Sequence, residues 1–110
     1  MGSITYNKLV RDLVPEEIRA NGDECVTRTI SGDEFKDALR KKLIEETEEV
    51  VKAENPELLK WELADVLEVV EALIAAHKID PNDVAECKKE KKRRRGGFTK
   101  GVMLESASEM

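Results

Sequence analysis

Apolar residues recur every three or four positions through the middle of the chain, which is the spacing of one face of an α-helix. An Asn-Pro step interrupts this pattern, so it predicts two long helices, over 32–53 and 56–78. Ser31 and Glu34 have the spacing of a capping box at the start of the first helix. Because the linker between the helices is short, we expect them to pack antiparallel.

Shorter elements are expected on both sides of this pair. A proline in the first turn and an Asn-Gly stop predict a short helix over 15–20, and an Asp-Pro step starts a further helix over 81–95. Residues 25–30 alternate like a short strand or extended segment, and 98–104 also read as extended. The predicted fold is therefore all-α, an antiparallel hairpin of long helices with additional helices and short extended flanks, in one domain over 1–110.

The composition is typical of a helical protein and argues against some classes of binding partner. Of the 110 residues, 39% are charged and only 4% are aromatic, and the formal net charge of -5 argues against nucleic acid or an anionic membrane as a general partner. No apolar run has the length of a signal peptide or a membrane span. With Cys25 and Cys87 expected as free thiols, these features predict a cytoplasmic protein.

The first long helix carries acids within its apolar stripe. On a helical wheel at about 100° per residue, Glu46 falls inside this stripe and Glu49 at its margin, whereas Glu48 lies on the opposite side. The apolar members of the stripe are Phe35, Leu39, Leu43, Val50 and Ala53.

The second long helix repeats the arrangement. Glu62 and Asp65 fall in the same arc as Val69, while Glu68 and Glu71 lie toward the polar side. Residues three apart on a helix are neighbours on one face, so each helix presents a pair of carboxylates toward the other helix.

Four partly buried carboxylates repel one another, since two charges about 4 Å apart interact by roughly 4 kcal/mol at an effective dielectric constant near 20. Protonation, basic side chains or bound divalent cations would each relieve this repulsion, and oxygen ligands favour Mg²⁺ or Mn²⁺ over Zn²⁺. Glutamate-rich helices are usually solvated faces, but a second pair at the same spacing, again on the apolar side, argues for a site.

These acids also carry a family resemblance. EETEE at 45–49, twelve further residues and ELAD at 62–65 match the pattern EExxE…ExxD. This resembles the MazG-like all-α NTP pyrophosphatase superfamily, which includes MazG, dimeric dUTPases and phosphoribosyl-ATP pyrophosphohydrolase. The segments 6–18 and 94–104 resemble a small single-domain branch described as house-cleaning or phosphoribosyl-ATP pyrophosphohydrolase-like.

The resemblance implies a helical core that dimerises and an acidic motif that binds Mg²⁺ through Glu46, Glu49, Glu62 and Asp65. Glu45 matches the first glutamate of the motif, and its place on the wheel favours a role beside the ligands. The catalytic candidates are Glu45 and Glu46, since a motif carboxylate can accept the proton of the attacking water. Attack at the α-phosphorus would release pyrophosphate and a nucleoside monophosphate. The resemblance does not indicate which nucleobase the substrate carries.

A triphosphate substrate also needs cations from the protein. Lys8 and Arg11 are candidates for phosphate contact, with salt bridges to surface acids as the alternative. Arg94 or Arg95 is a further candidate, next to glycines that permit close approach of the backbone. Phe98 is either a base-stacking residue or a hydrophobic anchor.

Three functions remain open. The first is a Mg²⁺-dependent nucleoside triphosphate pyrophosphohydrolase that removes non-standard nucleotides, and the second is phosphoribosyl-ATP pyrophosphohydrolase. The third is a non-enzymatic helical module that binds nucleic acid or a protein through the basic run at 88–95, although this run also fits a solvated helix end. Only the first two require the acidic site.

The second long helix is apolar around most of its circumference. A two-helix core cannot cover all of this surface, so we expect a homodimer or larger homo-oligomer. The contact would bury Trp61 or the side that carries Leu63, Leu67 and Ile74.

Overall fold

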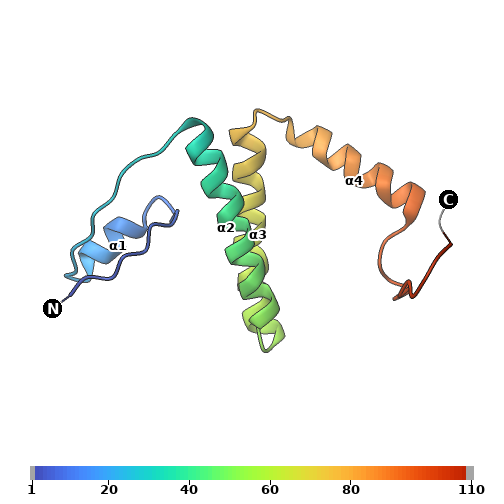
Figure 1. Cartoon of the computed structure of the whole chain (residues 1–110), viewed down its shortest axis with the longest axis horizontal. Coiled ribbons are helices and arrows are strands. Elements are labelled where there is room, and N and C mark those ends of the chain that lie inside the picture. The colour runs from blue at the N-terminus through green and yellow to red at the C-terminus, as the bar shows by residue number, and fades with distance from the viewer. Residues whose placement is uncertain (1, 109–110) are drawn as a thin grey trace. The chain divides into compact units, whose positions relative to one another are not determined.

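A computed structural model describes residues 2–108, and over this range the chain is helical with no strand (Figure 1). The helices are α1 (Val14–Ala20), α2 (Gly32–Lys52), α3 (Pro56–Ala76) and α4 (Pro81–Arg95). The predicted all-α fold is confirmed, and each helix begins within one residue of its expected start. None of the helices in the described part of the chain is long and apolar enough to cross a membrane.

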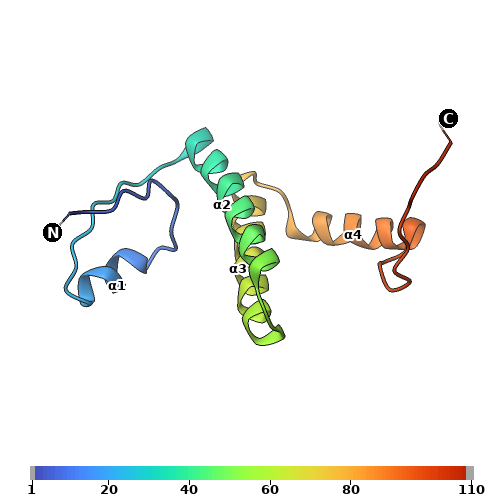
Figure 2. The same ribbon diagram turned by 60° about the horizontal axis from the view of Figure 1, so that its bottom comes forward.

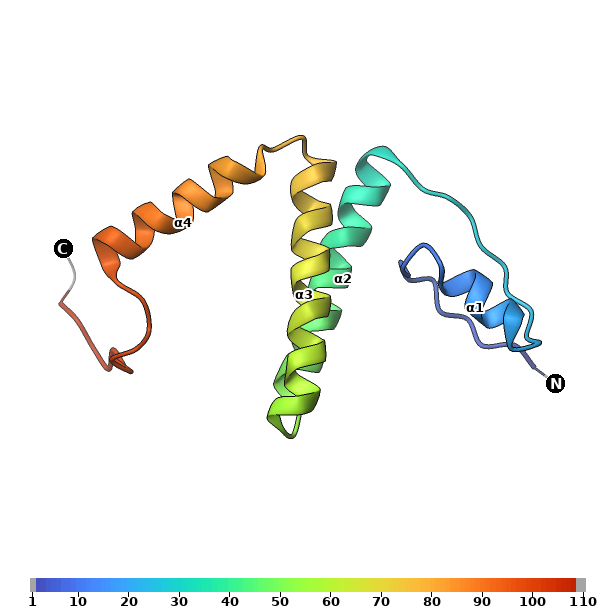
Figure 3. The same cartoon turned by 180° about the vertical axis from the view of Figure 1, so that it is seen from behind.

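The helices α2 and α3 run antiparallel and side by side, as Figures 1 and 3 both show. The predicted stripes form their contact, where Leu39 of α2 is 3% exposed and Val69 of α3 is 8% exposed. The other apolar members of the α2 stripe are half-buried. This contact fixes which side chains of the two helices face each other.

The helices α3 and α4 begin where the sequence predicts, each after a capping side chain. The Asn55 side chain accepts a hydrogen bond of 2.9 Å from the backbone N–H of Leu58, and a proline follows it. Asp80 caps α4 in the same way, accepting from Asn82 at 2.9 Å. These side chains satisfy backbone donors that the first turn of a helix leaves free.

The capping box expected at α2 is wrong. Ser31 occupies the N-cap position, but its side chain makes no capping hydrogen bond. Glu34 instead accepts two hydrogen bonds from the Arg28 guanidinium, at 3.1 and 2.6 Å. A bidentate, charge-assisted pair outcompetes the neutral backbone donor that the capping box offers to the same carboxylate.

The flanking segments match the expectation only in part, since they form no strand. Residues 25–30 have no strand pairing, because no neighbouring segment offers backbone hydrogen bonds to them. The stretch after α4 begins with a turn, closed by a 3.1 Å hydrogen bond from the N–H of Gly101 to the carbonyl of Phe98. A positive φ of 61° at Gly101 suits this turn.

The chain divides after Lys78 into two compact units (Figure 2). The first contains α1 and the α2–α3 hairpin, and the second contains α4 and the residues that follow it. No residue of α4 is buried. The core that orders functional side chains is therefore the contact between α2 and α3.

Candidate functional site

Three of the four predicted ligands converge in the hairpin. Glu46 of α2 and Glu62 and Asp65 of α3 each offer a carboxylate oxygen, and these oxygens all lie within 4.8 Å of one another. All three residues are half-buried. Glu49, the fourth predicted ligand, is exposed and lies outside this group. We call Glu46, Glu62 and Asp65 the acidic cluster.

The negative charges of the acidic cluster repel one another, as their spacing in the sequence predicted. The pKa of Glu62 is raised above 4.5, first by desolvation and then by the negative charges of Asp65, Glu49 and Glu46. Glu49 therefore acts on Glu62 through its charge although it is outside the cluster. Neighbouring carboxylates that repel one another bind a cation well, because the cation removes their repulsion.

The donor set fits a hard divalent cation. Ligand oxygens on an octahedral Mg²⁺ ion lie at about 2.1 Å from the metal, so two of them are at most about 4.2 Å apart. Only one pair of the three oxygens can lie opposite each other on such an ion, and adjacent ligands are about 3.0 Å apart, so carboxylate oxygens that lie within 4.8 Å would approach one another by up to roughly 1.8 Å, which side-chain rotation can supply. Three carboxylates without sulfur or imidazole favour Mg²⁺ or Mn²⁺.

Basic side chains surround these acids. Arg11 donates a hydrogen bond of 2.8 Å from its Nη2 to Asp65 Oδ1, and Lys8 Nζ lies 3.2 Å from Glu45 Oε1. Both predicted phosphate-binding residues of the N-terminal segment therefore lie against the motif. Basic side chains, one of the three ways in which the repulsion could be relieved, thus contact these acids in this structure.

Lys42 is a site residue that sequence reasoning missed. Its Nζ lies 3.4 Å from Glu46 Oε1 and 3.3 Å from Glu45 Oε1, and its side chain is only 15% exposed. The signal was present in the sequence, because Lys42 is seven residues after Phe35 and so falls near 340° on the same wheel, inside the apolar stripe. A lysine in that position needs an acidic partner.

Glu45 lies beside the cluster, as its place on the wheel suggested. Partial burial would by itself raise its pKa, but the hydrogen bond from Lys8 and the charge of Lys42 outweigh this, so the pKa of Glu45 is lowered. Glu45 is consequently held ionised between two lysines. This arrangement suits a residue that positions cations next to the acidic cluster.

Two hollows border the cluster, both between the N-terminal segment and the hairpin. The smaller, of about 390 Å³, has Tyr6, Val10 and Ile18 on its apolar wall. The larger, of about 600 Å³, is lined by apolar side chains of all three helices of the first unit and the segment before them. Both hollows are lined by Glu46 and Asp65 of the cluster and by the neighbouring cations Arg11 and Lys42.

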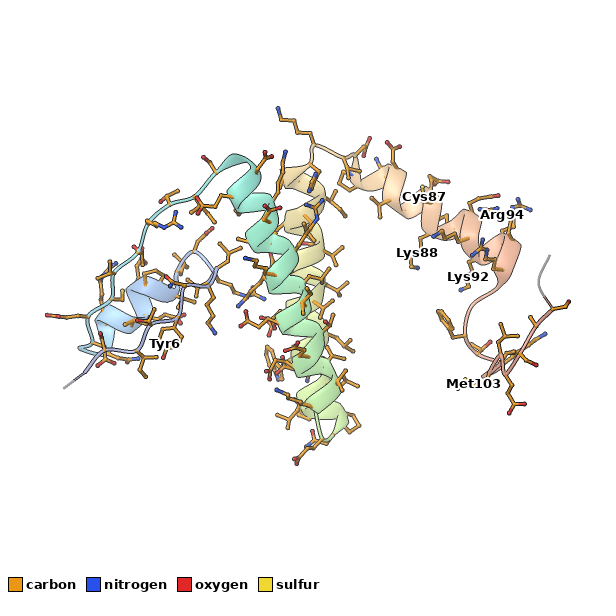
Figure 4. The ribbon with its side chains drawn as sticks, in the orientation of Figure 1. Tyr6, Cys87, Lys88, Lys92, Arg94 and Met103 are labelled. Atoms are coloured by element: carbon orange, nitrogen blue, oxygen red, sulfur yellow. The ribbon has the colours of Figure 1, made fainter. Side chains whose placement is uncertain are left out.

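The remaining predicted substrate-binding residues belong to the second unit. Arg94 pairs with Glu90 of its own helix at 3.3 Å, and the side chains of Lys88, Lys92 and Arg94 extend outward from α4 in Figure 4. Phe98 is 99% exposed, so in this chain it anchors nothing. Arg95 follows Arg94 as the last residue of α4.

Comparison with known proteins agrees with the acidic motif. A family model for the MazG nucleotide pyrophosphohydrolase domain matches residues 35–98, which is more than half of the chain. This range includes the whole acidic cluster. No solved structure matches the chain.

A relative from Mycolicibacterium smegmatis, named only as an uncharacterized protein, is 51% identical over 48 residues. The match covers 44% of this chain and 49% of the relative, so the chain spans about half of that protein's length. Proteins of the matched family are hydrolases that generally depend on a divalent metal. The chain belongs to the MazG nucleotide pyrophosphohydrolase family.

Proposed function

We propose that the chain hydrolyses nucleoside triphosphates to nucleoside monophosphates and pyrophosphate with Mg²⁺, and that it removes non-standard nucleotides. One observation carries this proposal: carboxylates from two packed helices converge within 4.8 Å in a chain of the MazG family. Mn²⁺ can take the place of Mg²⁺, since both ions take oxygen ligands.

Glu46, Glu62 and Asp65 are the proposed ligands, with Glu49 as a fourth that joins when its side chain turns inward. A bound ion supplies positive charge to phosphate oxygens and acidity to water. In the chain itself, Glu46 is the better placed of the two catalytic candidates, because it belongs to the cluster. Glu45 is engaged by Lys8 and Lys42 and orients them.

The cations of the first unit are proposed to bind the triphosphate. Lys8, Arg11 and Lys42 all border the smaller hollow beside the acidic cluster. Lysine offers a compact charge and arginine a bidentate fork, and both suit phosphate oxygens. For Arg94, Arg95 and Phe98, the proposed contact with substrate rests on the resemblance of 94–104 to the single-domain branch.

We also propose that the protein is a homodimer or larger homo-oligomer. In the first unit, only Leu39 and Val69 are buried among the described hydrophobic residues, while Trp61, Leu63 and Leu67 of α3 are exposed. Leu63 and Leu67 lie about 120–160° from Val69 around the helix, so the partner helix α2 does not cover them. A second copy would remove this apolar surface from water.

Light scattering at micromolar concentration tests the assembly. We expect a mass of at least twice that of the chain for the wild type, and a shift toward the monomer for Leu67→Lys. Glu71→Gln on the polar side of α3 makes the same charge change of +1 and should leave the mass unchanged. A monomeric wild type would contradict the assembly.

Pyrophosphate release tests the activity. The purified chain is incubated with a panel of standard and modified nucleoside triphosphates and with phosphoribosyl-ATP, in Mg²⁺ and in EDTA. We expect Mg²⁺-dependent release with preference for a modified nucleotide. Preference for phosphoribosyl-ATP would assign the biosynthetic reaction instead, and no release from any substrate would overturn the enzymatic proposal.

A further inference from the structure

Arg11 occupies a carboxylate that the proposed metal site requires. Its Nη2 lies 2.8 Å from Asp65 Oδ1, and Asp65 is a member of the acidic cluster. A second carboxylate, Glu68, lies 3.9 Å from the Arg11 Nη1 atom. The guanidinium thus pairs with one carboxylate of the cluster.

The two cations that touch the cluster are attached differently. Lys42 lies on α2 four residues before its partner Glu46 and is 15% exposed, so packing fixes it in place. Arg11 comes from the irregular segment before α1, and its side chain is 56% exposed. Arg11 can therefore leave without unpacking a helix, whereas Lys42 cannot.

We propose that Arg11 is a displaceable counter-ion that couples binding of the divalent cation to binding of the triphosphate. This inference rests on the proposed function and concerns how the same site is loaded. The guanidinium neutralises Asp65 while the site is free of metal and blocks it as a ligand. When the triphosphate is present, Arg11 transfers to its phosphate oxygens and releases Asp65 to the cation.

Energetics favour such an exchange. An exposed Arg–carboxylate pair is weak because water competes for both partners, so its loss costs little. Triphosphate oxygens offer the same fork of arginine donors a bidentate acceptor with more negative charge. A divalent ion then brings more positive charge to the cluster than the departing guanidinium removed.

The position of Arg11 supports the transfer. Arg11 and Asp65 line both hollows beside the cluster, so a ligand that enters either hollow meets the guanidinium next to the carboxylate. Glu68 keeps the guanidinium at this end of the site after it leaves Asp65. Coupling of this kind is reciprocal, so the metal ion must strengthen triphosphate binding by the same factor.

Titration calorimetry with Mn²⁺ tests the proposal without turnover. Mn²⁺ is titrated into the full chain alone and in the presence of inorganic tripolyphosphate, which is the base-free counterpart of the substrate. For the wild type, we expect the polyphosphate to tighten Mn²⁺ binding to the protein about tenfold, beyond the binding of Mn²⁺ by polyphosphate measured without protein. For Arg11→Gln, we expect Mn²⁺ alone to bind about 5- to 10-fold more tightly than in the wild type, with little further gain from polyphosphate.

Arg28→Gln is the matched control. It removes the same charge from another exposed Arg–carboxylate pair of the first unit, and the partner carboxylate, Glu34, lies outside the acidic cluster. We expect its Mn²⁺ affinity to stay within about twofold of the wild type, since a distant exposed charge is screened. Arg11→Lys retains the charge and should restore part of the coupling, with circular dichroism confirming that each variant is folded.

The outcomes separate this inference from the proposed function. Unchanged or weaker Mn²⁺ binding by Arg11→Gln would overturn the counter-ion role, and so would an equal gain in Arg28→Gln. Tighter binding by Arg11→Gln with no hydrolysis of any nucleotide would support the counter-ion and reject the enzymatic proposal. Absence of Mn²⁺ binding in every protein, with and without polyphosphate, would reject both.

Discussion

Charged residues make up more than half of both α2 and α4, but the two helices use them differently. In α2, Lys42 and Glu46 are side by side and only 15% and 13% exposed, next to a helix that buries Leu39. In α4, no residue is buried, and its ion pairs join residues three or four apart on the same helix, such as Glu90 with Arg93 and Arg94.

The difference shows that charge density by itself does not mark a functional site. Solvated pairs such as those of α4 contribute little, because water screens them and both side chains lose conformational freedom. Charges placed within an apolar stripe are partly desolvated, so each one requires a partner or a ligand. Glu46, Glu62 and Asp65 are partly desolvated charges of this second kind, which makes them candidates for binding a ligand.

The largest expected effect concerns activity. Asp65→Asn or Glu62→Gln should lower turnover about 1000-fold, because each removes a charged ligand from the acidic cluster while preserving the side-chain volume. Glu90→Gln makes the same chemical change on α4 and should leave turnover within about twofold. Pyrophosphate release by the three variants gives the answer, and a fall in turnover for Glu90→Gln alone would reverse the comparison.

Melting curves extend the same experiment to stability. In EDTA, Asp65→Asn should be as stable as the wild type or more so, since the Arg11 pair that it weakens is exposed and one repelling anion is gone. Stabilisation by added Mg²⁺ should shrink in the variant, because this stabilisation comes from binding to the folded state. A large loss of stability in EDTA would identify a structural ion pair instead.

The next largest effect is on the free energy of unfolding, when a buried side chain is truncated. Leu39→Ala should destabilise the fold by about 2–3 kcal/mol, because Leu39 is 3% exposed in the contact between α2 and α3. Val84→Ala on α4 should cost about 0.5 kcal/mol or less, since Val84 is 36% exposed. Urea denaturation of both variants measures the difference. Equal costs would show that α4 is packed in solution.

Smaller effects are expected from cations outside the cluster. Lys8→Ala and Arg95→Ala should each raise KM about tenfold with unchanged circular dichroism, as expected for loss of one charge-assisted hydrogen bond to a phosphate. Lys89→Ala, in an exposed pair with Glu86, is the control for α4 and should not change KM. An unchanged KM for Arg95→Ala would leave substrate binding to the first unit.

The smallest effect is a pH dependence of the metal-free protein. The folded-state pKa of Glu62 is raised above 4.5 by desolvation and by its acidic neighbours, so the folded state binds more protons than the unfolded state just above this value. The contribution of Glu62 therefore favours folding at low pH and is lost as pH rises through the folded pKa.

Glu62→Gln should remove this contribution. Relative to the wild type, the metal-free variant should melt at a higher temperature at pH 7, and the difference should shrink toward pH 4 as Glu62 becomes protonated in the wild type. Glu45→Gln should behave in the opposite sense, because the pKa of Glu45 is lowered by its lysines. A difference between wild type and Glu62→Gln that does not vary with pH would contradict the proposed repulsion.

Much of the hairpin could be predicted from local patterns. The stripe from Phe35 to Ala53 is buried or half-buried as expected, and Glu46, Glu62 and Asp65 lie where their wheel positions place them. The wheel works here because one long partner helix covers one face of α2, so periodicity and burial coincide.

Pairing between distant residues could not be predicted in the same way. Glu49 lies at the margin of the stripe, and whether a margin position is covered depends on the side chains of the facing helix, which here leave it exposed. Glu34 was expected to cap a helix, but it accepts hydrogen bonds from Arg28 of the preceding segment instead. Local spacing identifies the available partners, and the surroundings decide between them.

By itself, the sequence determined the helices, their apolar stripes and the acids that belong to those stripes, because these follow from residue spacing of about 3.6 per turn. Only the tertiary structure decided that Arg11 reaches Asp65 across 54 positions and Lys8 reaches Glu45 across 37. The physical reason is that an ion pair between distant segments forms only if the fold brings the two side chains together. Helical periodicity specifies which residues share a face of one helix, but not which distant segment approaches that face.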